Sequence, residues 1–260
     1  LGGDDVNSNH SQTASRCAID FRDYDLNYCE QNWPELVMRV RTLVKPQRDT
    51  ARRKAHRIYW WQHGDKRPAL YKRIRGKDKV FVISRHTKYV AFVAVSPDNV
   101  FQESLCIVDL PSWASFCFVQ SSIHDAWVRR GSSTMGATLR YTPSDYFDTF
   151  PFLHLQDTHL DKIGECYHSL RKEIMFARKE GITDIYNRLH NPDETSADIH
   201  ELRQLHLKMD CAVLTAYGWH DIDLKHNFHD TKQGVCFSIS ERSRRELLHR
   251  LLLLNHDCHK

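Results

Sequence analysis

The sequence predicts an α+β fold, in which a mixed or antiparallel sheet with flanking helices is followed by a C-terminal helical region. Two observations predict it. Three short runs rich in Val, Ile and Phe, at 80–83, 89–95 and 105–110, are separated by polar connections, as in neighbouring strands of one sheet. Toward the C-terminus, apolar residues recur at helical spacing instead. We therefore expect a domain containing the sheet over 1–155 and a helical region over 156–260.

Before the sheet, the chain is predicted to form a polar arm followed by helices. Residues 27–44 carry apolar residues at helical spacing, and Lys45-Pro46 ends that helix because a residue before proline disfavours the helical conformation. Asp49 or Thr50 can cap the next helix. In order, the expected elements are an arm at 1–17, a strand at 18–21, and helices at 27–44, 50–61 and 69–74.

After the three strand runs, the pattern returns to helices and turns. Ser112 is expected to cap a helix, and Gly218 is expected to stop another, because glycine readily takes the conformation that ends helices. The remaining expected elements are a helix at 113–130, a loop at 131–136, a strand at 137–141, a turn at 142–145, an extended aromatic stretch at 147–152, helices at 160–179, 183–189, 197–217 and 240–255, an irregular segment at 221–233 and an apolar run at 235–239.

Positive charge is concentrated in one segment. Residues 39–88 hold 17 Lys and Arg against three acids, a net charge of about +14, whereas the whole chain is +4. In the expected helix, Arg53, Arg57 and Trp60 share one face. A dense basic block with interleaved aromatic residues is typical of a protein that binds a polyanion. The alternative is a solvated helix face, but the adjacent Trp60 and Trp61 argue against it and are expected to pack in a core.

The sequence carries few signs of chemistry other than binding. It lacks the glycine-rich phosphate loops, the Gly-x-Ser-x-Gly nucleophile elbow and paired cysteine–histidine motifs of zinc sites, so we expect no catalytic and no metal-ligating residues. Without a sufficiently long apolar run or a leader pattern, we expect a cytoplasmic protein with no membrane partner. The first residue is Leu rather than Met, which suggests a fragment of a longer or processed chain.

The loop at 131–136 has the composition of a loop that enters a groove. Glycine permits close approach of the backbone, and the short side chains of Ser132, Ser133 and Thr134 leave room for base edges. The alternative is a plain flexible connection. Arg140, which follows shortly, can donate two hydrogen bonds to one guanine.

Several short motifs then occur in a fixed order along the whole chain. They are Leu1-Gly2-Gly3-Asp4-Asp5-Val6, Lys45-Pro46-x-Arg48-Asp49, Arg52-Arg53-Lys54-Ala55, Trp60-Trp61-Gln62-x-Gly64-x-x-Arg67-Pro68, Ser84-Arg85-x-x-Lys88-Tyr89-Val90-Ala91-Phe92, Gln120-Ser121-Ser122-Ile123-His124-x-Ala126-Trp127, Leu139-Arg140-Tyr141-Thr142-Pro143-Ser144-Asp145, Thr149-Phe150-Pro151-Phe152 and Ala216-Tyr217-Gly218-Trp219. In these motifs the chain resembles the C-terminal target-recognition region of large adenine-N6 DNA methyltransferases, including MmeI-like restriction–modification enzymes and the methylases of phage-defence systems such as DISARM and BREX.

The resemblance implies a DNA specificity module. In that family the catalytic half, which binds S-adenosylmethionine, precedes this region, so the implied partners are double-stranded DNA and an N-terminal methyltransferase domain, and this chain is expected to hold no cofactor and not to be catalytic alone. The segment before the Arg-Tyr motif reads bases in the family, which falls here on Gly136, Ala137 and Thr138, with Arg140 in the motif. Gly136 and Thr138 replace long charged residues of some relatives, so the recognised sequence does not transfer.

The basic motifs imply contacts to the DNA backbone. Two alternatives remain open: a stand-alone nuclease, and a module that docks an acidic protein of a defence complex. His124 and Trp127 are expected to pack in the core. The expected contacts to phosphate are Arg48, Arg52, Arg53, Lys54, Arg57, Arg67, Arg85 and Lys88.

Overall fold

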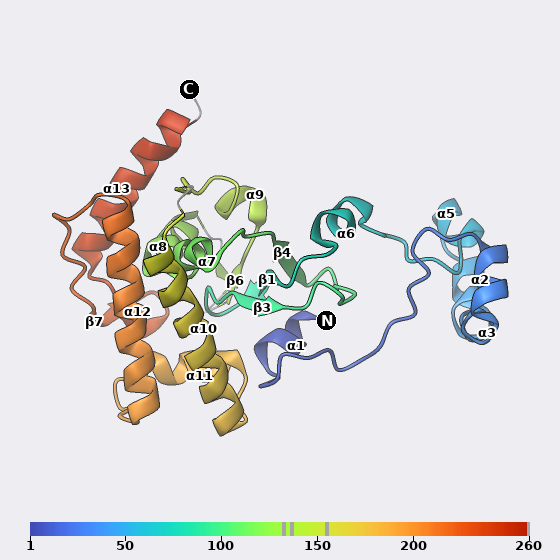
Figure 1. The fold of residues 1–260 in the computed structure, drawn as a ribbon, viewed down its shortest axis with the longest axis horizontal. Coiled ribbons are helices and arrows are strands. Elements are labelled where there is room, and N and C mark those ends of the chain that lie inside the picture. The colour runs from blue at the N-terminus through green and yellow to red at the C-terminus, as the bar shows by residue number, and fades with distance from the viewer. Residues whose placement is uncertain (132–133, 136–137, 154–155, 259–260) are drawn as a thin grey trace. The chain divides into compact units, whose positions relative to one another are not determined.

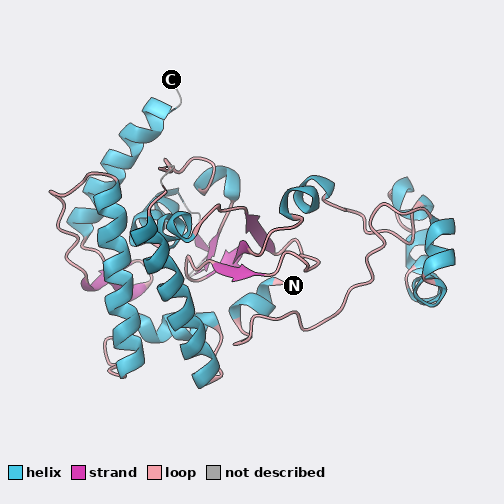
Figure 2. Ribbon diagram, in the orientation of Figure 1, coloured by secondary structure: helices cyan, strands magenta, loops and turns pink. Residues whose placement is uncertain are grey.

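The computed structural model describes residues 1–131, 134–135, 138–153 and 156–258. Contacts within the chain divide it into two units: unit 1 comprises residues 1–15 and 78–260, and unit 2 comprises residues 16–77 (Figure 1). The division at residue 155 that we expected from the sequence stays a prediction about domains. The predicted fold class is confirmed, because small antiparallel sheets are flanked by helices and followed by a helical region (Figure 2).

Unit 2 is a set of short helices on a small core. The core side chains are Phe21, Cys29, Val37, Val40 and Trp60. The expected strand at 18–21 is wrong, because Phe21 enters this core from a segment without strand structure. The helices are α2 (Leu26–Asn32), α3 (Pro34–Leu43), α4 (Lys45–Asp49), α5 (Lys54–Ile58) and α6 (Pro68–Ile74).

Two long helices expected in unit 2 are shorter in the structure. The predicted helix at 27–44 breaks at Trp33, because Pro34 has no N–H to continue a helix and opens α3 instead. It ends just before Lys45-Pro46, as predicted. The predicted helix at 50–61 is reduced to α5, so Trp60 lies beyond its end and does not share a helical face with Arg53 and Arg57.

The N-terminal residues belong to unit 1 and do not form the expected arm. They include helix α1 (Gly3–Asn7), in which Val6 is fully buried. The terminal ammonium of Leu1 donates to the Val100 carbonyl at 2.7 Å, and the Gly3 N–H donates to Ser104 Oγ at 3.0 Å. The polar composition of the segment led to the prediction of an arm, but its two apolar residues, Leu1 and Val6, are buried and hold it in unit 1.

The first sheet forms the centre of unit 1. Strand β1 (Val80–Ser84) lies between β3 (Val93–Val95) and β4 (Leu105–Val108), and both pairings are antiparallel as predicted. All five residues of β1 are buried, which explains why this strand reads as a continuous apolar run rather than as an alternation. The Phe81 ring stacks on the Phe116 ring of a covering helix, with centroids 5.3 Å apart.

A second small sheet has the order β2 (His86–Thr87), β6 (Thr138–Arg140), β5 (Thr134–Met135). The predicted strand at 137–141 is confirmed as β6. The loop expected at 131–136 is partly strand, because β5 pairs antiparallel with β6. The turn expected at 142–145 is the short helix α9 (Pro143–Tyr146).

The helix expected at 113–130 forms as two helices, α7 (Trp113–Gln120) and α8 (Ser122–Gly131). They are separated at Ser121, whose backbone is extended. The predicted cap is confirmed, because the Ser112 hydroxyl accepts a hydrogen bond from the Ser115 N–H at 3.1 Å. The second helix, α8, ends at Gly131, directly before the segment at 132–137.

The C-terminal helices match the sequence prediction closely. They are α10 (Thr158–Arg178), α11 (Ile182–Leu189), α12 (Ala197–Ala216) and α13 (Glu241–Cys258), and α10 packs against both α7 and α12 (Figure 1). Gly218, with φ of +73°, follows the end of α12 as expected. The segment expected to be irregular at 221–233 instead includes β7 (Asn227–Thr231), which forms a hairpin with β8 (Gly234–Ser238).

A buried arginine joins the helices to the first sheet. Arg171 on α10 is 1% exposed and donates to the Phe92 carbonyl, to Gln120 Oε1 at 3.1 Å and to the Tyr186 hydroxyl at 3.1 Å. Burying a cation is costly unless its donors are satisfied, and here three acceptors from three segments satisfy them. This arrangement fixes the helical region on the sheet. No helix in the described part of the chain is long and apolar enough to cross a membrane.

Candidate nucleic-acid interface

The second sheet brings two sequence-distant segments into register. His86 of β2 pairs with Arg140 of β6, and Thr87 pairs with Leu139. Thr87 and Leu139 are buried, whereas His86, Thr138 and Arg140 are exposed. Because side chains alternate along a strand and directly paired residues share a face, these three exposed side chains lie on one face of the sheet.

Two of the six predicted base-reading residues therefore have a described side chain on this face. They are Thr138 and Arg140. Ser132, Ser133 and Gly136 lie outside the described residues, and Thr134 is described only as a strand residue paired with Leu139. His86 was not predicted from the sequence. It stands in the Ser-Arg-x-x-Lys motif at a position without a fixed residue type, and only the strand register brings it next to Arg140.

Arg85 and Lys88 flank β2 and are held in place by neutral acceptors. Arg85 Nε donates to the Glu103 carbonyl at 2.6 Å, and the Arg85 carbonyl accepts from the Tyr141 N–H at 2.7 Å. Lys88 Nζ donates to Asn187 Oδ1 at 2.8 Å. Both side chains are half-buried. Since these acceptors are uncharged, neither hydrogen bond balances the positive charge of the side chain that donates it.

The C-terminal end of α8 is fixed next to the same sheet. Arg129 Nε donates to both carboxylate oxygens of Asp125 at 2.8 Å, and Arg129 Nη2 reaches the Lys88 carbonyl at 3.4 Å. Burial alone would raise the pKa of Asp125, but the neighbouring Arg129 guanidinium outweighs it and lowers that pKa. The ion pair thus persists at neutral pH and fixes the last turn of α8.

The other six predicted phosphate contacts all lie in unit 2. Arg52, Arg53 and Lys54 are consecutive and exposed, and no carboxylate partner is found for them among the described residues. Arg57 is exposed and donates to the Ala51 and Arg52 carbonyls. The other two of the six are Arg48, which is half-buried, and Arg67, which is paired with Asp65 at 3.4 Å.

The charge of the chain is divided unequally between its units. Residues 16–77 contain 16 Lys and Arg and seven Asp and Glu, a net charge of +9. Since the chain as a whole is +4, unit 1 carries −5. The predicted phosphate contacts of unit 2 therefore lie on a strongly basic unit, while the base-reading candidates lie in unit 1, and each surface is described by itself.

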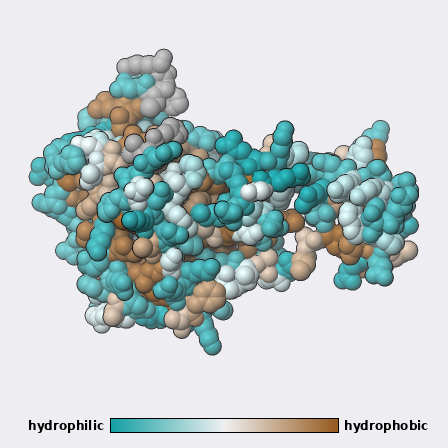
Figure 3. Space-filling model, viewed as in Figure 1, coloured by the Kyte–Doolittle hydropathy of each residue, from teal (hydrophilic) through white to brown (hydrophobic). Residues whose placement is uncertain are grey.

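The aromatic residues of unit 2 separate into buried and exposed groups. Trp60 is 6% exposed in the core, as predicted, and Trp61 Nε1 donates to the Tyr24 carbonyl at 3.0 Å. Tyr24 and Tyr28 are exposed and stacked, with centroids 4.7 Å apart. Apolar side chains are visible among hydrophilic ones in Figure 3. The prediction that His124 and Trp127 pack in the core is confirmed, since both are fully buried.

Within the part of the chain that the structure describes, no group of three or more His, Cys, Asp or Glu side chains is arranged to hold a metal ion. Each unit thus presents its own candidate surface: the exposed face of β2 and β6 in unit 1, and the exposed basic residues in unit 2.

Comparisons with known proteins identify the family of the chain. The family described as "MmeI, target recognition domain" matches residues 8–154. No curated protein matches the chain. A solved structure of the type IIL restriction-modification enzyme MmeI in complex with DNA has a similar fold, with a TM-score of 0.67 and 15% sequence identity. The match covers 99% of this chain and 30% of that chain, so the chain spans less than a third of the length of that enzyme.

The family match covers more than half of the 260 residues and includes the second sheet with its exposed face. The resemblance found in the sequence motifs is thereby confirmed, and the chain belongs to the MmeI target recognition domain family.

Proposed function

We propose that this chain binds double-stranded DNA and reads its sequence for a larger enzyme. The observation that carries the proposal is the exposed face on which His86, Thr138 and Arg140 lie together, in a chain of the target recognition domain family. The related MmeI structure was solved in complex with DNA, which supports duplex DNA as the ligand.

The chemistry of the face suits the edges of base pairs. The Arg140 guanidinium can donate two hydrogen bonds to O6 and N7 of a guanine, and Thr138 can donate or accept. The His86 imidazole adds a second group of mixed character next to Arg140. The exposed cations of unit 2, with Arg85 and Lys88, would contact phosphates and set the register of the protein on the duplex.

The larger enzyme in this proposal is an S-adenosylmethionine-dependent adenine-N6 DNA methyltransferase of a restriction–modification or phage-defence system. Its methyltransferase domain would bind the cofactor and methylate an adenine that has been rotated out of the duplex. This chain would determine which site is modified. The proposal rests on the motif order in the sequence and on the family match.

A selection experiment tests the proposal directly. The 260-residue chain is mixed with a pool of duplexes of random sequence, bound duplexes are sequenced over several rounds, and affinity is then measured by fluorescence anisotropy over a range of salt concentrations. We expect a defined base preference and an affinity that falls steeply with salt. Affinity that does not change with salt, or selected duplexes without a common sequence, would refute it.

The two alternative functions give different results in the same setting. A stand-alone nuclease would cut plasmid DNA in the presence of Mg²⁺, whereas a recognition module leaves it intact. A module that docks an acidic protein would bind a polyanionic protein of matched charge as well as it binds duplex DNA.

A further inference from the structure

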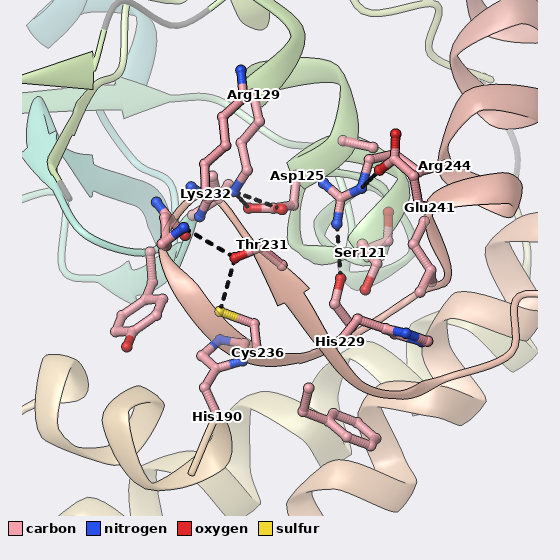
Figure 4. A pocket seen from close by; sticks show the side chains of 18 of the residues that line it. Ser121, Asp125, Arg129, His190, His229, Thr231, Lys232, Cys236, Glu241 and Arg244 are labelled. Atoms are coloured by element: carbon pink, nitrogen blue, oxygen red, sulfur yellow. Dashed lines mark hydrogen bonds and ion pairs between the residues drawn. The ribbon is translucent and has the colours of Figure 1, made fainter. Parts of the chain in front are cut away.

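Unit 1 contains a cavity that the candidate DNA-binding face does not use. Its volume is about 480 Å³, within the range of about 300–1,000 Å³ of ligand pockets. It lies between α8, the end of α11, the β7–β8 hairpin and the start of α13 (Figure 4). All of these elements belong to unit 1.

One side of the cavity is aromatic and has a hydrogen-bonding group without a partner. The Tyr89 and His190 rings stack with centroids 4.8 Å apart and an interplanar angle of 24°, and Tyr186 lies beside them. His190 Nδ1 is buried and has no hydrogen-bond partner in the described structure. Burial lowers the pKa of His190 to about 3, so the ring is neutral at pH 7. Because this atom has almost no accessible surface, a ligand that brings a partner would reach it after a rotation of the imidazole ring.

Another part of the cavity wall presents cations with unused donors. Arg129 contacts Asp125 only through Nε, and its Nη2 makes just the long contact of 3.4 Å to the Lys88 carbonyl. Lys232, on the hairpin, is exposed and forms no ion pair with any described residue (Figure 4). Arg244, on α13, is already engaged, because it donates to Ser238 Oγ at 3.1 Å and pairs with Glu241 at 3.8 Å.

The charges of the cavity leave an excess of positive charge. Its lining contains four Lys and Arg and three Asp and Glu. Two of the acids are already paired, Asp125 with Arg129 at 2.8 Å and Glu241 with Arg244 at 3.8 Å. An anionic group entering the cavity thus meets a guanidinium edge and an unpaired ammonium, which are donors suited to a phosphate.

We propose that this cavity binds a nucleotide. The base would pack in the aromatic side and pair with His190 Nδ1, and the phosphate would contact Arg129 and Lys232. The nucleotide comes either from solution or from bound DNA, as a nucleotide rotated out of the duplex. The second source rests on the proposed function, and it is compatible with the fold because Arg129 also reaches the Lys88 carbonyl, directly after β2, at 3.4 Å.

Calorimetry on the 260-residue chain tests the proposal with four probes: AMP, GMP, CMP and inorganic phosphate. We expect at least one nucleotide to bind at least tenfold more tightly than phosphate, because phosphate cannot use the aromatic side. Lys232→Ala should lower the affinity for that nucleotide roughly tenfold, which corresponds to the loss of one charge-assisted hydrogen bond. His190→Leu should lower the affinity for the nucleotide and leave the affinity for phosphate unchanged. Lys208→Ala, an exposed lysine of α12 outside the cavity lining, should have no effect.

A second measurement separates the two sources and separates this proposal from the proposed function. Affinity is compared for a fully paired duplex and for the same duplex with one unpaired nucleotide, in the wild-type chain and in Lys232→Ala. If the duplex with an unpaired nucleotide binds more tightly than the paired duplex, and Lys232→Ala abolishes the difference, DNA is the source. If only mononucleotides bind, the nucleotide comes from solution.

Three results would overturn the cavity proposal. The first is that neither a mononucleotide nor an unpaired nucleotide in a duplex binds more tightly than its reference. The second is that phosphate and nucleotides bind equally. The third is that neither Lys232→Ala nor His190→Leu changes nucleotide binding. If the paired duplex still binds in those cases, only the cavity proposal fails. Nucleotide binding without any duplex binding would refute the proposed function instead.

Discussion

His86 on β2 lies directly opposite Arg140 on β6, and both side chains are exposed while their strand neighbours Thr87 and Leu139 are buried. The register of these two short strands decides which residues face solvent, since a shift of one residue would bury His86 and Arg140. The Tyr141 N–H, which donates to the Arg85 carbonyl at 2.7 Å, holds that register beyond the paired residues.

Arg140→Ala should reduce both affinity and specificity. If Arg140 contacts a guanine through two hydrogen bonds, its loss should cost about 1–3 kcal/mol on the selected duplex and relax the preference at one base pair. His86→Ala should change the preference at the same or the adjacent base pair. Anisotropy with the selected duplex and its single-base variants measures both effects.

Arg245→Ala is the matched control for Arg140→Ala. Arg245 is a surface arginine of α13, with a side chain that is 78% exposed, and it lies outside both candidate surfaces. Its replacement should leave the affinity and the preferred sequence unchanged. Equal losses for Arg245→Ala and Arg140→Ala would mean that Arg140 acts only through general charge.

Replacing Arg52, Arg53 and Lys54 together by alanine should weaken binding without changing the preferred sequence. If all three contact phosphates, the slope of log affinity against log salt should become shallower by about 2.7, at roughly 0.9 per contact. A triple replacement of the exposed Lys162, Lys172 and Lys208 in unit 1 is the control. An unchanged slope in the first variant would exclude these three residues from the interface.

The sequence predicts most elements of this fold because long, strongly periodic segments can be assigned without knowledge of their tertiary contacts. The apolar periodicity of α10 and α12 and the continuous apolar run of β1 leave no competing arrangement. The predictions are wrong where a tertiary contact determines the burial or the local structure of a residue. Val6 is an isolated apolar residue in a polar segment, and only the packing of α1 against β1 reveals its burial.

The candidate site was predictable only in part for the same reason. Arg140 carries its own chemical signal, because arginine after a small-residue loop suits a guanine edge. His86 carries none, since its place beside Arg140 follows from pairing across more than 50 residues. The cavity likewise depends on the β7–β8 hairpin, whose first strand falls in the segment at 221–233 that was predicted to be irregular.

Stability should fall as the pH drops below about 6.5. Burial, with a smaller contribution from Arg171, lowers the pKa of His168 to about 3, and burial lowers that of His124 to about 3 from an ordinary value of 6.5. Between these values the unfolded chain binds protons that the folded chain does not, so each group costs roughly 1.4 kcal/mol per pH unit. Urea unfolding at pH 7, 6 and 5.5 measures the slope.

His168→Gln isolates one of these two histidines. His168 Nε2 accepts a hydrogen bond from the Ala94 N–H at 3.2 Å, and a glutamine oxygen can replace that acceptor without titrating. The variant should lose about a third of the pH dependence in this window at most, because burial also lowers the pKa of His190 to about 3. A slope identical to that of the wild type would show that His168 does not remain neutral in the folded chain.

Gly164→Ala should destabilise the chain although alanine is the better helix former. A Cβ at Gly164 would lie 2.5 Å from the Trp113 carbonyl oxygen and 2.9 Å from Cys117 Sγ, so α10 and α7 would have to separate. Gly131→Ala at the end of α8 is the control, because its Cβ would meet only Tyr146 at 3.8 Å. Thermal unfolding should show a lower midpoint for Gly164→Ala alone, and equal midpoints would contradict the close approach of the two helices.

Arg171→Met and Arg178→Met test how differently two arginines of one helix contribute. Arg171 is 1% exposed, and its removal takes a donor from the buried Phe92 carbonyl. Gln120 Oε1 keeps the Phe92 N–H at 2.9 Å, and the Tyr186 hydroxyl keeps Gln120 Nε2 at 2.9 Å. We expect a loss of about 1–3 kcal/mol, the cost of a buried acceptor left without its donor.

Arg178 instead pairs with Asp198 at 2.7 Å near the surface, where its side chain is 23% exposed. Water can solvate the carboxylate that Arg178→Met leaves behind, so the loss should be about 1 kcal/mol or less. Urea unfolding of both variants gives the two free energies. Equal losses would mean that Arg171 does not hold the helical region on the sheet, since a surface ion pair of the same helix would then contribute as much as its buried network.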